Sequence, residues 1–238
     1  MEADASRRQR CARALPSPNV KLFITGTDTG VGKTFVTAAI ARRGVSLGKR
    51  VFAFKPIETG CIGEGPDQAE LCAAAGGWQR GELRGLYAFE QPAAPWAAAG
   101  AASIEMDRVV RVASGQHVDL TLVEGAGGWR VPISATTDMG ALARRLGFPV
   151  VIVARATLGT INHSLLTVEA VERDGCRVAA LMLSQRPEDD AKFAADNLAR
   201  IRSRWSGTSL LFTGNPSELD PLFHVEHAVN RDSALPPT

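Results

Sequence analysis

The chain has 238 residues, of which 45% are hydrophobic and 22% are charged, a balance typical of soluble globular proteins. This length accommodates one large domain with a real core, or two small ones. The net charge of +2, without a basic block beyond the N-terminal arginines, argues against a nucleic-acid partner. Because no stretch approaches the roughly 18 apolar residues that a membrane helix needs, we expect no membrane partner. The four scattered cysteines favour free thiols and a cytoplasmic location.

Apolar β-branched runs alternate with helix-length segments, which is typical of βαβ units and a parallel sheet. We predict one α/β domain over residues 19–224, with helices on both faces of the sheet. Residues 1–18 are predicted as a disordered extension and residues 225–238 as a flexible tail. The predicted strands span residues 20–25, 50–54, 119–123, 149–154, 177–183 and 208–212. The predicted helices span residues 33–48, 67–76, 103–115, 138–147, 161–174 and 188–204, and a long connection spans residues 88–102.

The first predicted strand runs into the glycine-bearing string GTDTGVGKT, residues 26–34, and then into a helix. This order aims backbone N–H groups at one point and predicts a phosphate site, with Lys33 beside the terminal phosphates. The hydroxyl of Thr34 stands where such loops place a Mg²⁺ ligand. Gly26 lies one residue earlier than the usual G-x4-G-K-[ST] spacing requires, but the core from Gly30 to Thr34 is intact. We interpret the loop as a nucleotide site of the P-loop NTPase type.

Ligands of an open parallel sheet bind beyond the carboxyl ends of its strands, so the residues after each strand are candidates. Lys55 follows the second predicted strand, where it either steadies developing negative charge or is simply an exposed strand-end lysine. Asp67 opens the next predicted helix, either as its N-cap or as a carboxylate that reaches a magnesium ion. Taken singly, the two residues leave both alternatives open.

The third predicted strand ends in the string VEGAGGW, residues 123–129. Many P-loop proteins place a Mg²⁺-linked acid directly after such a strand, which makes Glu124 a candidate ligand. Gly125 and Gly127 then allow a ligand to approach the backbone closely.

Together these strings resemble the dethiobiotin synthetase family. The matching segments run in the same order from about residue 21 to residue 184 and comprise GTDTGVGKT, KPIETG, the Asp67 region, YAFEQPAAP, VEGAGGW, VPIS and LGTINHSLLT. In that family, one amine of 7,8-diaminopelargonic acid takes up CO₂ as a carbamate, ATP phosphorylates the carbamate, and the second amine closes a ureido ring. The resemblance therefore implies ATP and Mg²⁺ as cofactors, small-molecule substrates and a homodimer.

The resemblance also implies a role for each matched residue. Lys33 and Lys55 would be the catalytic lysines, with Lys55 stabilising the carbamate and its charged transition state. The residues contacting the diamine or the carbamate would be Thr29 and Thr59. The Mg²⁺ ligands would be Thr34, Asp67 and Glu124. The nucleotide-binding residues would be Gly30, Val31, Gly32, Lys33, Thr34, Phe35, Asp67, Glu124, Gly125, Ala126, Gly127, Ser184 and Gln185.

Three positions depart from the family pattern. Trp96 stands where a histidine is common, which affects the substrate pocket. Ser184 and Gln185 stand where an asparagine usually reads the adenine base, so either base selectivity is looser or Gln185 substitutes. Residues 212–216 also differ from the usual strand-end Gly-x-x-Pro.

Three other functions compete with this interpretation. A cobyrinate amidase-like enzyme of the same lineage usually carries a glutamine-hydrolysing domain, for which this chain has no room. A partition or septum-site ATPase resembles KGGxGKT, whereas Asp28 occupies the place of its signature lysine. An inactive nucleotide-binding homologue would account for the altered base pocket.

Overall fold

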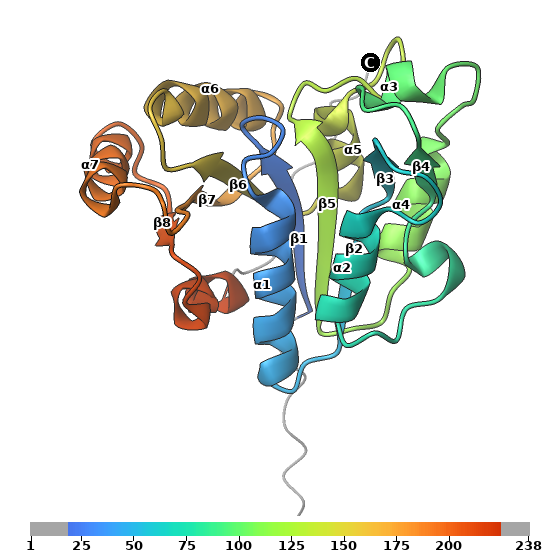
Figure 1. Ribbon diagram of the computed structural model, residues 1–238, viewed down its shortest axis with the longest axis horizontal. Helices are drawn as coiled ribbons and strands as arrows, with labels where there is room; N and C mark the ends of the chain where they lie inside the picture. Colours follow the sequence, from blue (N-terminus) through green and yellow to red (C-terminus); the bar gives the residue numbers. More distant parts are fainter. Residues whose placement is uncertain (1–18, 225–238) are drawn as a thin grey trace, which may run out of the picture.

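The structure of the protein is a computed structural model that describes residues 19–224; the predicted extension 1–18 and tail 225–238 lie outside the described residues. Its main sheet has six parallel strands in the order β2-β5-β1-β6-β7-β8 (Figure 1). The strands are β1 (Val20–Gly26), β2 (Val51–Phe54), β5 (Leu120–Gly128), β6 (Val150–Arg155), β7 (Val178–Ser184) and β8 (Ser209–Phe212). The predicted parallel α/β architecture is therefore confirmed.

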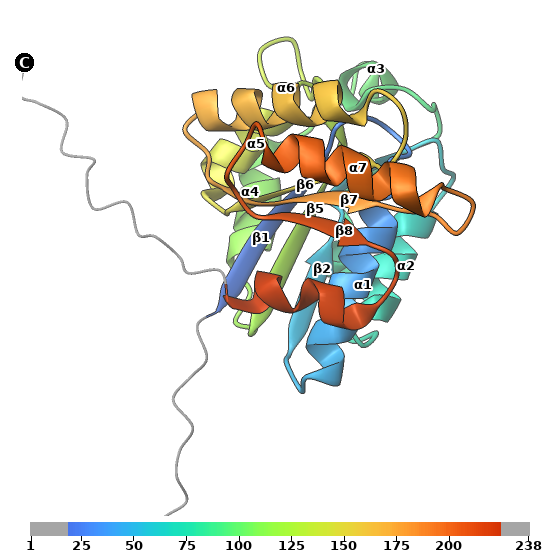
Figure 2. The same ribbon diagram turned by 90° about the vertical axis from the view of Figure 1, so that its left-hand side faces the viewer.

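Helices cover both faces of this sheet, as Figure 2 shows in a view along its edge. Successive side chains of a strand point to opposite faces. In β1, Leu22 and Ile24 accordingly belong to one apolar layer and Phe23 to the other. The first layer packs against α1 (Lys33–Ser46), α2 (Pro66–Ala74) and the 3₁₀ segment η2 (Pro216–His224). The second packs against α4 (Met106–Ser114), α5 (Met139–Leu146), α6 (Thr160–Arg173) and α7 (Ala191–Arg202).

The segment predicted as a plain connection, residues 88–102, is more structured than its composition indicates. It contributes to β4 (Tyr87–Phe89), which pairs in parallel with β3 (Ile57–Thr59) in a separate two-stranded sheet, and it contains the short helix α3 (Pro95–Ala99). One further turn of 3₁₀ helix, η1 (Gly81–Leu83), precedes β4. Strands of three residues are too short to show an alternating pattern, so the sequence analysis did not predict β3 and β4.

Strand β5 also extends further than predicted. It continues through the glycines of VEGAGGW to Gly128 and stays paired with β1, where Ile24 lies opposite Glu124 and Gly26 opposite Gly128. Glycine disfavours strands, which is why the sequence places the end at residue 123. Here glycine relieves a tight contact, because a Cβ on Gly128 would lie 3.2 Å from the carbonyl oxygen of Gly26. Glu124 is therefore held inside a strand instead of following one.

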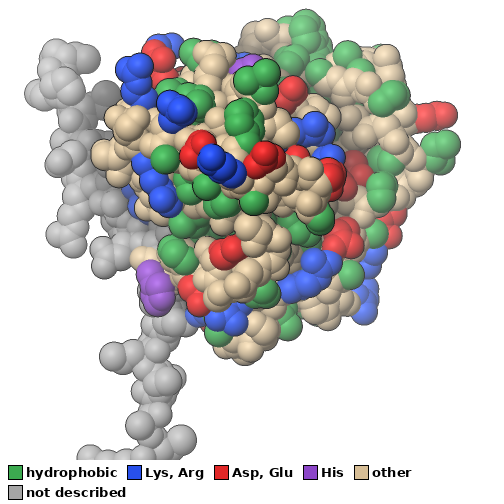
Figure 3. Space-filling view, turned by 60° about the vertical axis from the view of Figure 1, so that its left-hand side comes forward, with side chains coloured by type: hydrophobic (Ala, Val, Ile, Leu, Met, Phe, Trp, Pro, Cys, Tyr) green, Lys and Arg blue, Asp and Glu red, His purple; other side chains and the backbone are tan. Residues whose placement is uncertain are grey.

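Charges on the described surface are mixed. On the face drawn in Figure 3, basic and acidic side chains are interspersed. Among residues 19–224, no helix is both long and apolar enough to cross a membrane.

Asp174 ties the segment after β5 to two helices. Its carboxylate accepts a hydrogen bond of 2.8 Å from the indole Nε1 of the buried Trp129, and it pairs with Arg130 and Arg144. Asp174 caps the C-terminus of α6, where the helix dipole disfavours an acid, so these tertiary partners account for its presence. Burial raises the pKa of its carboxyl, but the hydrogen bonds from Arg130 and Trp129 outweigh burial and lower it below the ordinary value of 3.8.

We predict that Asp174→Ala lowers the free energy of unfolding by about 1–3 kcal/mol at neutral pH, because the buried indole N–H loses its acceptor. Since the folded-state pKa is depressed, the contribution of Asp174 is complete above pH 3.8 and is lost as the pH falls through the folded-state value. Urea unfolding at several pH values measures both effects. Glu169→Ala, which removes an exposed pair with Arg173 on α6, is the control and should change stability by no more than about 0.5 kcal/mol. Equal stability of the two variants at pH 7 would contradict this role.

Candidate active site

The phosphate loop joins β1 to α1 through two glycines with left-handed backbone conformations. Gly30 has a φ of 69° and Gly32, the N-cap of α1, has a φ of 98°. Residues with a Cβ rarely adopt these angles, so the core spacing of the motif follows from the turn itself. The 14-residue helix that starts at Lys33 places its positive dipole end at this loop. The loop therefore has the backbone geometry of an anion site.

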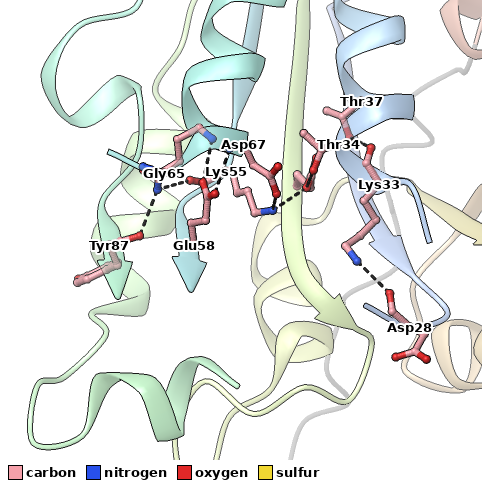
Figure 4. Close-up of polar contacts among 11 residues, drawn as sticks. Asp28, Lys33, Thr34, Thr37, Lys55, Glu58, Gly65, Asp67 and Tyr87 are labelled. Carbon is pink, nitrogen blue, oxygen red and sulfur yellow. Dashed lines mark hydrogen bonds and ion pairs between the residues drawn. The ribbon is translucent and has the colours of Figure 1, made fainter. Parts of the chain in front are cut away.

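The early glycine of the motif also has a structural reason. A Cβ on Gly26 would lie 2.7 Å from the carbonyl oxygen of Asp28 and 2.9 Å from the Nζ of Lys33. Lys33 folds back across this point, and its ammonium donates a 3.0 Å hydrogen bond to the Asp28 carbonyl (Figure 4). The glycine is thus required where the lysine passes over the chain.

A buried carboxylate joins the loop to the end of β2. Glu124 is fully buried, and its Oε1 accepts hydrogen bonds from the hydroxyl of Thr34 at 2.8 Å and the Nζ of Lys55 at 3.0 Å. Lys55 pairs in addition with Asp67 (Figure 4). Residues 34, 67 and 124 lie in α1, α2 and β5 and residue 55 follows β2, and these contacts bring them into one cluster.

The two lysines of the site differ in their electrostatics. The pKa of Lys33 is lowered to about 8, mainly by burial; Glu124 opposes this shift, and nearby Lys55 acts in the same direction as burial. Burial also disfavours the charge of Lys55, but the carboxylates of Glu124 and Asp67 outweigh it and raise the pKa of Lys55 above its ordinary value. Lys55 is therefore a fixed positive charge at neutral pH and is unsuited to act as a base.

Glu58, a residue of the KPIETG string, fixes the position of Asp67. The buried carboxylate of Glu58 accepts hydrogen bonds from the backbone N–H groups of Asp67 at 3.0 Å and Gln68 at 2.9 Å, at the start of α2 (Figure 4). Gly65 is the N-cap of α2, so the alternative that Asp67 caps this helix is wrong. A Cβ on Gly65 would collide with the Glu58 carboxylate, at 2.0 Å from Oε2. Because Glu58 caps the helix, the Asp67 side chain is available to Lys55.

The cluster is suited to Mg²⁺. The Oε2 of Glu124 is buried and has no hydrogen-bond partner among the described residues, which leaves one carboxylate oxygen available to a cation. Thr34 and Asp67 add a hydroxyl and a second carboxylate, the hard oxygen ligands that Mg²⁺ prefers. Within residues 19–224, no group of three or more His, Cys, Asp or Glu side chains could hold a metal ion alone. This donor set therefore fits an ion shared with substrate phosphates, as is usual for Mg²⁺.

One cleft of about 600 Å³ collects most of the predicted site residues. Its lining includes Thr29, Gly30, Gly32, Lys33, Thr34, Phe35, Lys55, Glu58, Thr59, Asp67, Ala126 and Gly127, together with residues 92–95 and Val131. Glu124 is fully buried and touches the lining residues Thr34 and Lys55. Val31 is buried, and a Cβ on Gly125 would lie 3.0 Å from the ring of Phe23, so neither residue lines the cleft.

The two residues expected at the base pocket are not part of this lining. Ser184 is buried, and its Oγ would lie 2.9 Å from a Cβ on Gly32, so it packs directly behind the loop. The backbone N–H of Gln185 donates to the carbonyl of Phe212 at 2.9 Å. Trp96, another residue that departs from the family pattern, is half exposed on α3. Its backbone N–H donates to the carbonyl of Pro132.

Two arginines at the loop were missed by the sequence analysis. Arg155 is the last residue of β6, and Arg186 follows β7. The guanidinium of Arg155 donates to the carbonyl oxygen of Gly30 from Nε at 3.2 Å and from Nη2 at 3.1 Å, and Arg186 reaches the same oxygen at 3.4 Å. The strand-end rule could have found Arg155, because it stands where Lys55 stands on β2.

The family described as an AAA domain matches residues 20–214. ATP-dependent dethiobiotin synthetase BioD of Anaeromyxobacter dehalogenans (strain 2CP-C) is 44% identical over 192 residues, which are 77% of this chain and 86% of that protein. The protein of the same name from Anaeromyxobacter sp. (strain Fw109-5) is 42% identical over 189 residues, covering 76% of this chain and 83% of that one.

Solved structures support the fold. The MinC:MinD cell division protein complex of Aquifex aeolicus matches with a TM-score of 0.52 at 14% identity, covering 86% of this chain and 85% of that one. The signal recognition particle receptor FtsY of Elizabethkingia anophelis matches with a TM-score of 0.51 at 16% identity, covering 87% and 68%. At these identities the likeness concerns the P-loop NTPase-like fold alone.

We predict that Glu58→Ala lowers the free energy of unfolding by about 1–3 kcal/mol, because two N–H groups at the start of α2 lose their acceptor in a buried setting. Urea unfolding measures the loss. Glu64→Ala is the matched control: Glu64 lies in the connection from β3 to α2 and pairs with Arg84 at the surface, so its removal should cost about 0–1 kcal/mol. A loss for Glu58→Ala no larger than that of the control would show that the cap is dispensable.

Proposed function

This chain belongs to the family of ATP-dependent dethiobiotin synthetases and is an ATP-dependent ligase, and we propose that its reaction takes place in the cleft between the phosphate loop and Lys55. One observation carries the proposal. Lys33, Thr34, Lys55 and Asp67 line one cleft, and the buried Glu124 bonds to two of them, so that a phosphate loop, two cationic side chains and a set of oxygen ligands lie together.

The proposed reaction converts 7,8-diaminopelargonic acid, CO₂ and ATP into dethiobiotin, ADP and phosphate. An amine nitrogen of the diamine bonds to the carbon of CO₂ and loses a proton, which gives a carbamate. A carbamate oxygen then bonds to the γ-phosphorus of ATP as the bond to ADP breaks. The second amine attacks the carbon of this mixed anhydride, the C–O bond to phosphate breaks, and the ureido ring closes. Because the substrate supplies every nucleophile, the protein contributes orientation and charge stabilisation.

We assign the charge stabilisation to the two lysines. Lys33 lies at the end of the loop, and nearby carboxylates offset only part of the cost of burying its charge. A polyphosphate would therefore draw its ammonium away from the Asp28 carbonyl. Lys55 lines the cleft, and its charge is held by Glu124 and Asp67, which suits it to stabilise the negative charge of the carbamate and its transition state. Thr29 and Thr59 line the same cleft and would contact the diamine or the carbamate through their hydroxyls.

Mg²⁺ would be held by Thr34, Asp67 and Glu124. When bound, the ion neutralises charge on the phosphates that are transferred. The unpartnered Oε2 of Glu124 supports this assignment, since a buried carboxylate oxygen without a donor is costly unless a cation satisfies it.

We also propose that the protein is a cytoplasmic homodimer. The resemblance to the family supports a site completed by a second subunit. Two exposed apolar side chains near the start of α6 support an interface there: Leu158 is 90% exposed and Leu166 is 56% exposed. The described cysteines Cys61, Cys72 and Cys176 are free thiols, which accords with a reducing compartment.

The direct test of the function combines labelled bicarbonate, 7,8-diaminopelargonic acid, Mg²⁺ and ATP, followed by a search for a labelled cyclic urea. We expect the label in dethiobiotin and one ADP per ring formed. Absence of label from any product, under conditions in which the protein binds ATP, would overturn the proposal and favour an inactive nucleotide-binding homologue.

Lys55→Ala is predicted to lower turnover by at least about 10²-fold, the usual cost of removing a charge that stabilises a transition state. ADP should still bind, because Lys55 is not part of the phosphate loop. Product formation and calorimetric ADP binding measure the two effects, and Lys192→Ala, an exposed lysine at the start of α7, is the control. Normal turnover of Lys55→Ala would remove this lysine from the mechanism.

Asp67→Asn and Thr34→Ala are predicted to raise the Mg²⁺ concentration needed for half-maximal turnover by roughly 10-fold each, because each loses a hard ligand. The measurement is a Mg²⁺ titration at saturating ATP. Asp28→Asn is the control and should leave the Mg²⁺ requirement unchanged. Asp28 lies in the phosphate loop, but its carboxylate accepts a hydrogen bond from the neighbouring N–H of Thr29 and is not one of the proposed Mg²⁺ ligands. An unchanged Mg²⁺ requirement in both variants would refute the ligand set.

A further inference from the structure

Among the described residues, the carbonyl oxygen of Gly30 accepts three hydrogen bonds from outside the loop, all from guanidinium N–H groups. Arg155 contributes Nε and Nη2, at 3.2 and 3.1 Å, and Arg186 contributes one Nη2 at 3.4 Å. Both arginines come from neighbouring strand ends, since Arg155 lies opposite Ser184 in the β6–β7 register and Arg186 follows Ser184 by two residues. Two cationic side chains thus converge on one neutral oxygen.

This arrangement has an electrostatic cost that needs a reason. Two guanidinium groups near one atom repel each other. Arg186 also pairs with the carboxylate of Glu188, but that distance of 3.8 Å is longer than its 3.4 Å contact with the Gly30 carbonyl. Hydrogen bonds from charged donors are stronger than neutral ones, so the pair holds the carbonyl firmly. The restrained atom belongs to the phosphate loop itself.

The restraint falls on the Gly30–Val31 peptide of the phosphate loop. Gly30 and Gly32 both have left-handed backbone conformations, and glycine crosses between conformations more readily than other residues. In a planar trans peptide, the C=O of Gly30 and the N–H of Val31 point in opposite directions. Arg155 and Arg186 are not among the residues that line the cleft. Because they hold the Gly30 carbonyl, the Val31 N–H points away from them.

We infer that Arg155, assisted by Arg186, is a positioning residue that holds the Gly30–Val31 peptide in its phosphate-binding orientation before a nucleotide arrives. The inference rests on the proposed function only in that it assumes a nucleotide phosphate in this loop. Holding the peptide in advance removes an ordering cost from binding. The charged donors also polarise the peptide, which strengthens its N–H as a donor to an anion. The arginines act through the loop and do not contact the nucleotide.

The experiment compares Arg155→Ala, Arg155→Lys, Arg186→Ala and the double alanine variant with the unmodified chain. Two quantities are measured: hydrogen exchange of residues 27–34 without nucleotide, and the Kd of ADP by calorimetry. We expect Arg155→Ala to speed exchange in the loop and to weaken ADP binding roughly 10-fold, the loss expected for a charge-assisted bond. Arg155→Lys, which keeps the charge but loses the two-donor fork, should lie between. Arg186→Ala should change Kd about 2-fold. The double variant should be the weakest binder.

Arg173→Ala is the control, because Arg173 is an exposed arginine of α6 paired only with Glu169 in the described contacts; neither quantity should change. An ADP Kd within 2-fold of the unmodified value in the double variant would overturn the inference. Weaker binding with unchanged exchange of the free loop would also overturn it, since that result indicates direct contact with the nucleotide. A protein that shows both expected effects but forms no labelled cyclic urea would refute the proposed function and leave this inference standing.

Discussion

The site depends on one buried charge. Glu124 has no exposed surface, and the preceding residues on its side of β5, Leu120 and Leu122, are buried and apolar. An ionised carboxylate in such a position is strongly destabilising unless donors or cations satisfy it. Thr34 at the start of α1 and Lys55 after β2 meet this requirement from either side. The need to satisfy one carboxylate therefore brings the phosphate loop and the strand-end lysine together.

The same constraint extends outward through Lys55. Its ammonium pairs with Asp67 as well as with Glu124. The Asp67 carboxylate is available for this pair because Glu58, and not Asp67, caps α2. The small β3–β4 sheet carries Glu58, so an element with three-residue strands decides where a Mg²⁺-type carboxylate lies. The charge network and the secondary structure are thus interdependent: the carboxylate of Asp67 is positioned by Lys55 and by the contact of Glu58 with the start of α2.

Close backbone approach is the second determinant of the cleft. Gly26 makes room for Lys33, Gly65 for the Glu58 carboxylate, and Gly128 for the carbonyl of Gly26. Each glycine stands where a single added carbon would displace a charged group or a strand. This explains why Gly26 lies one residue outside the usual spacing of the phosphate loop: its position follows the path of the Lys33 side chain in this fold.

Much of this protein was determined by its sequence alone. The alternation of apolar strands and helices predicted the parallel sheet, and the strings around Lys33, Lys55 and Glu124 predicted the family, because short-range periodicity and collinear motifs are local properties of a chain. The tertiary structure alone decided that β5 runs on through its glycines, that Glu58 caps the helix of Asp67, and that Arg155 grips the loop. These features join residues far apart in sequence, and their energies come from burial and charge pairing, which exist only once the chain has folded.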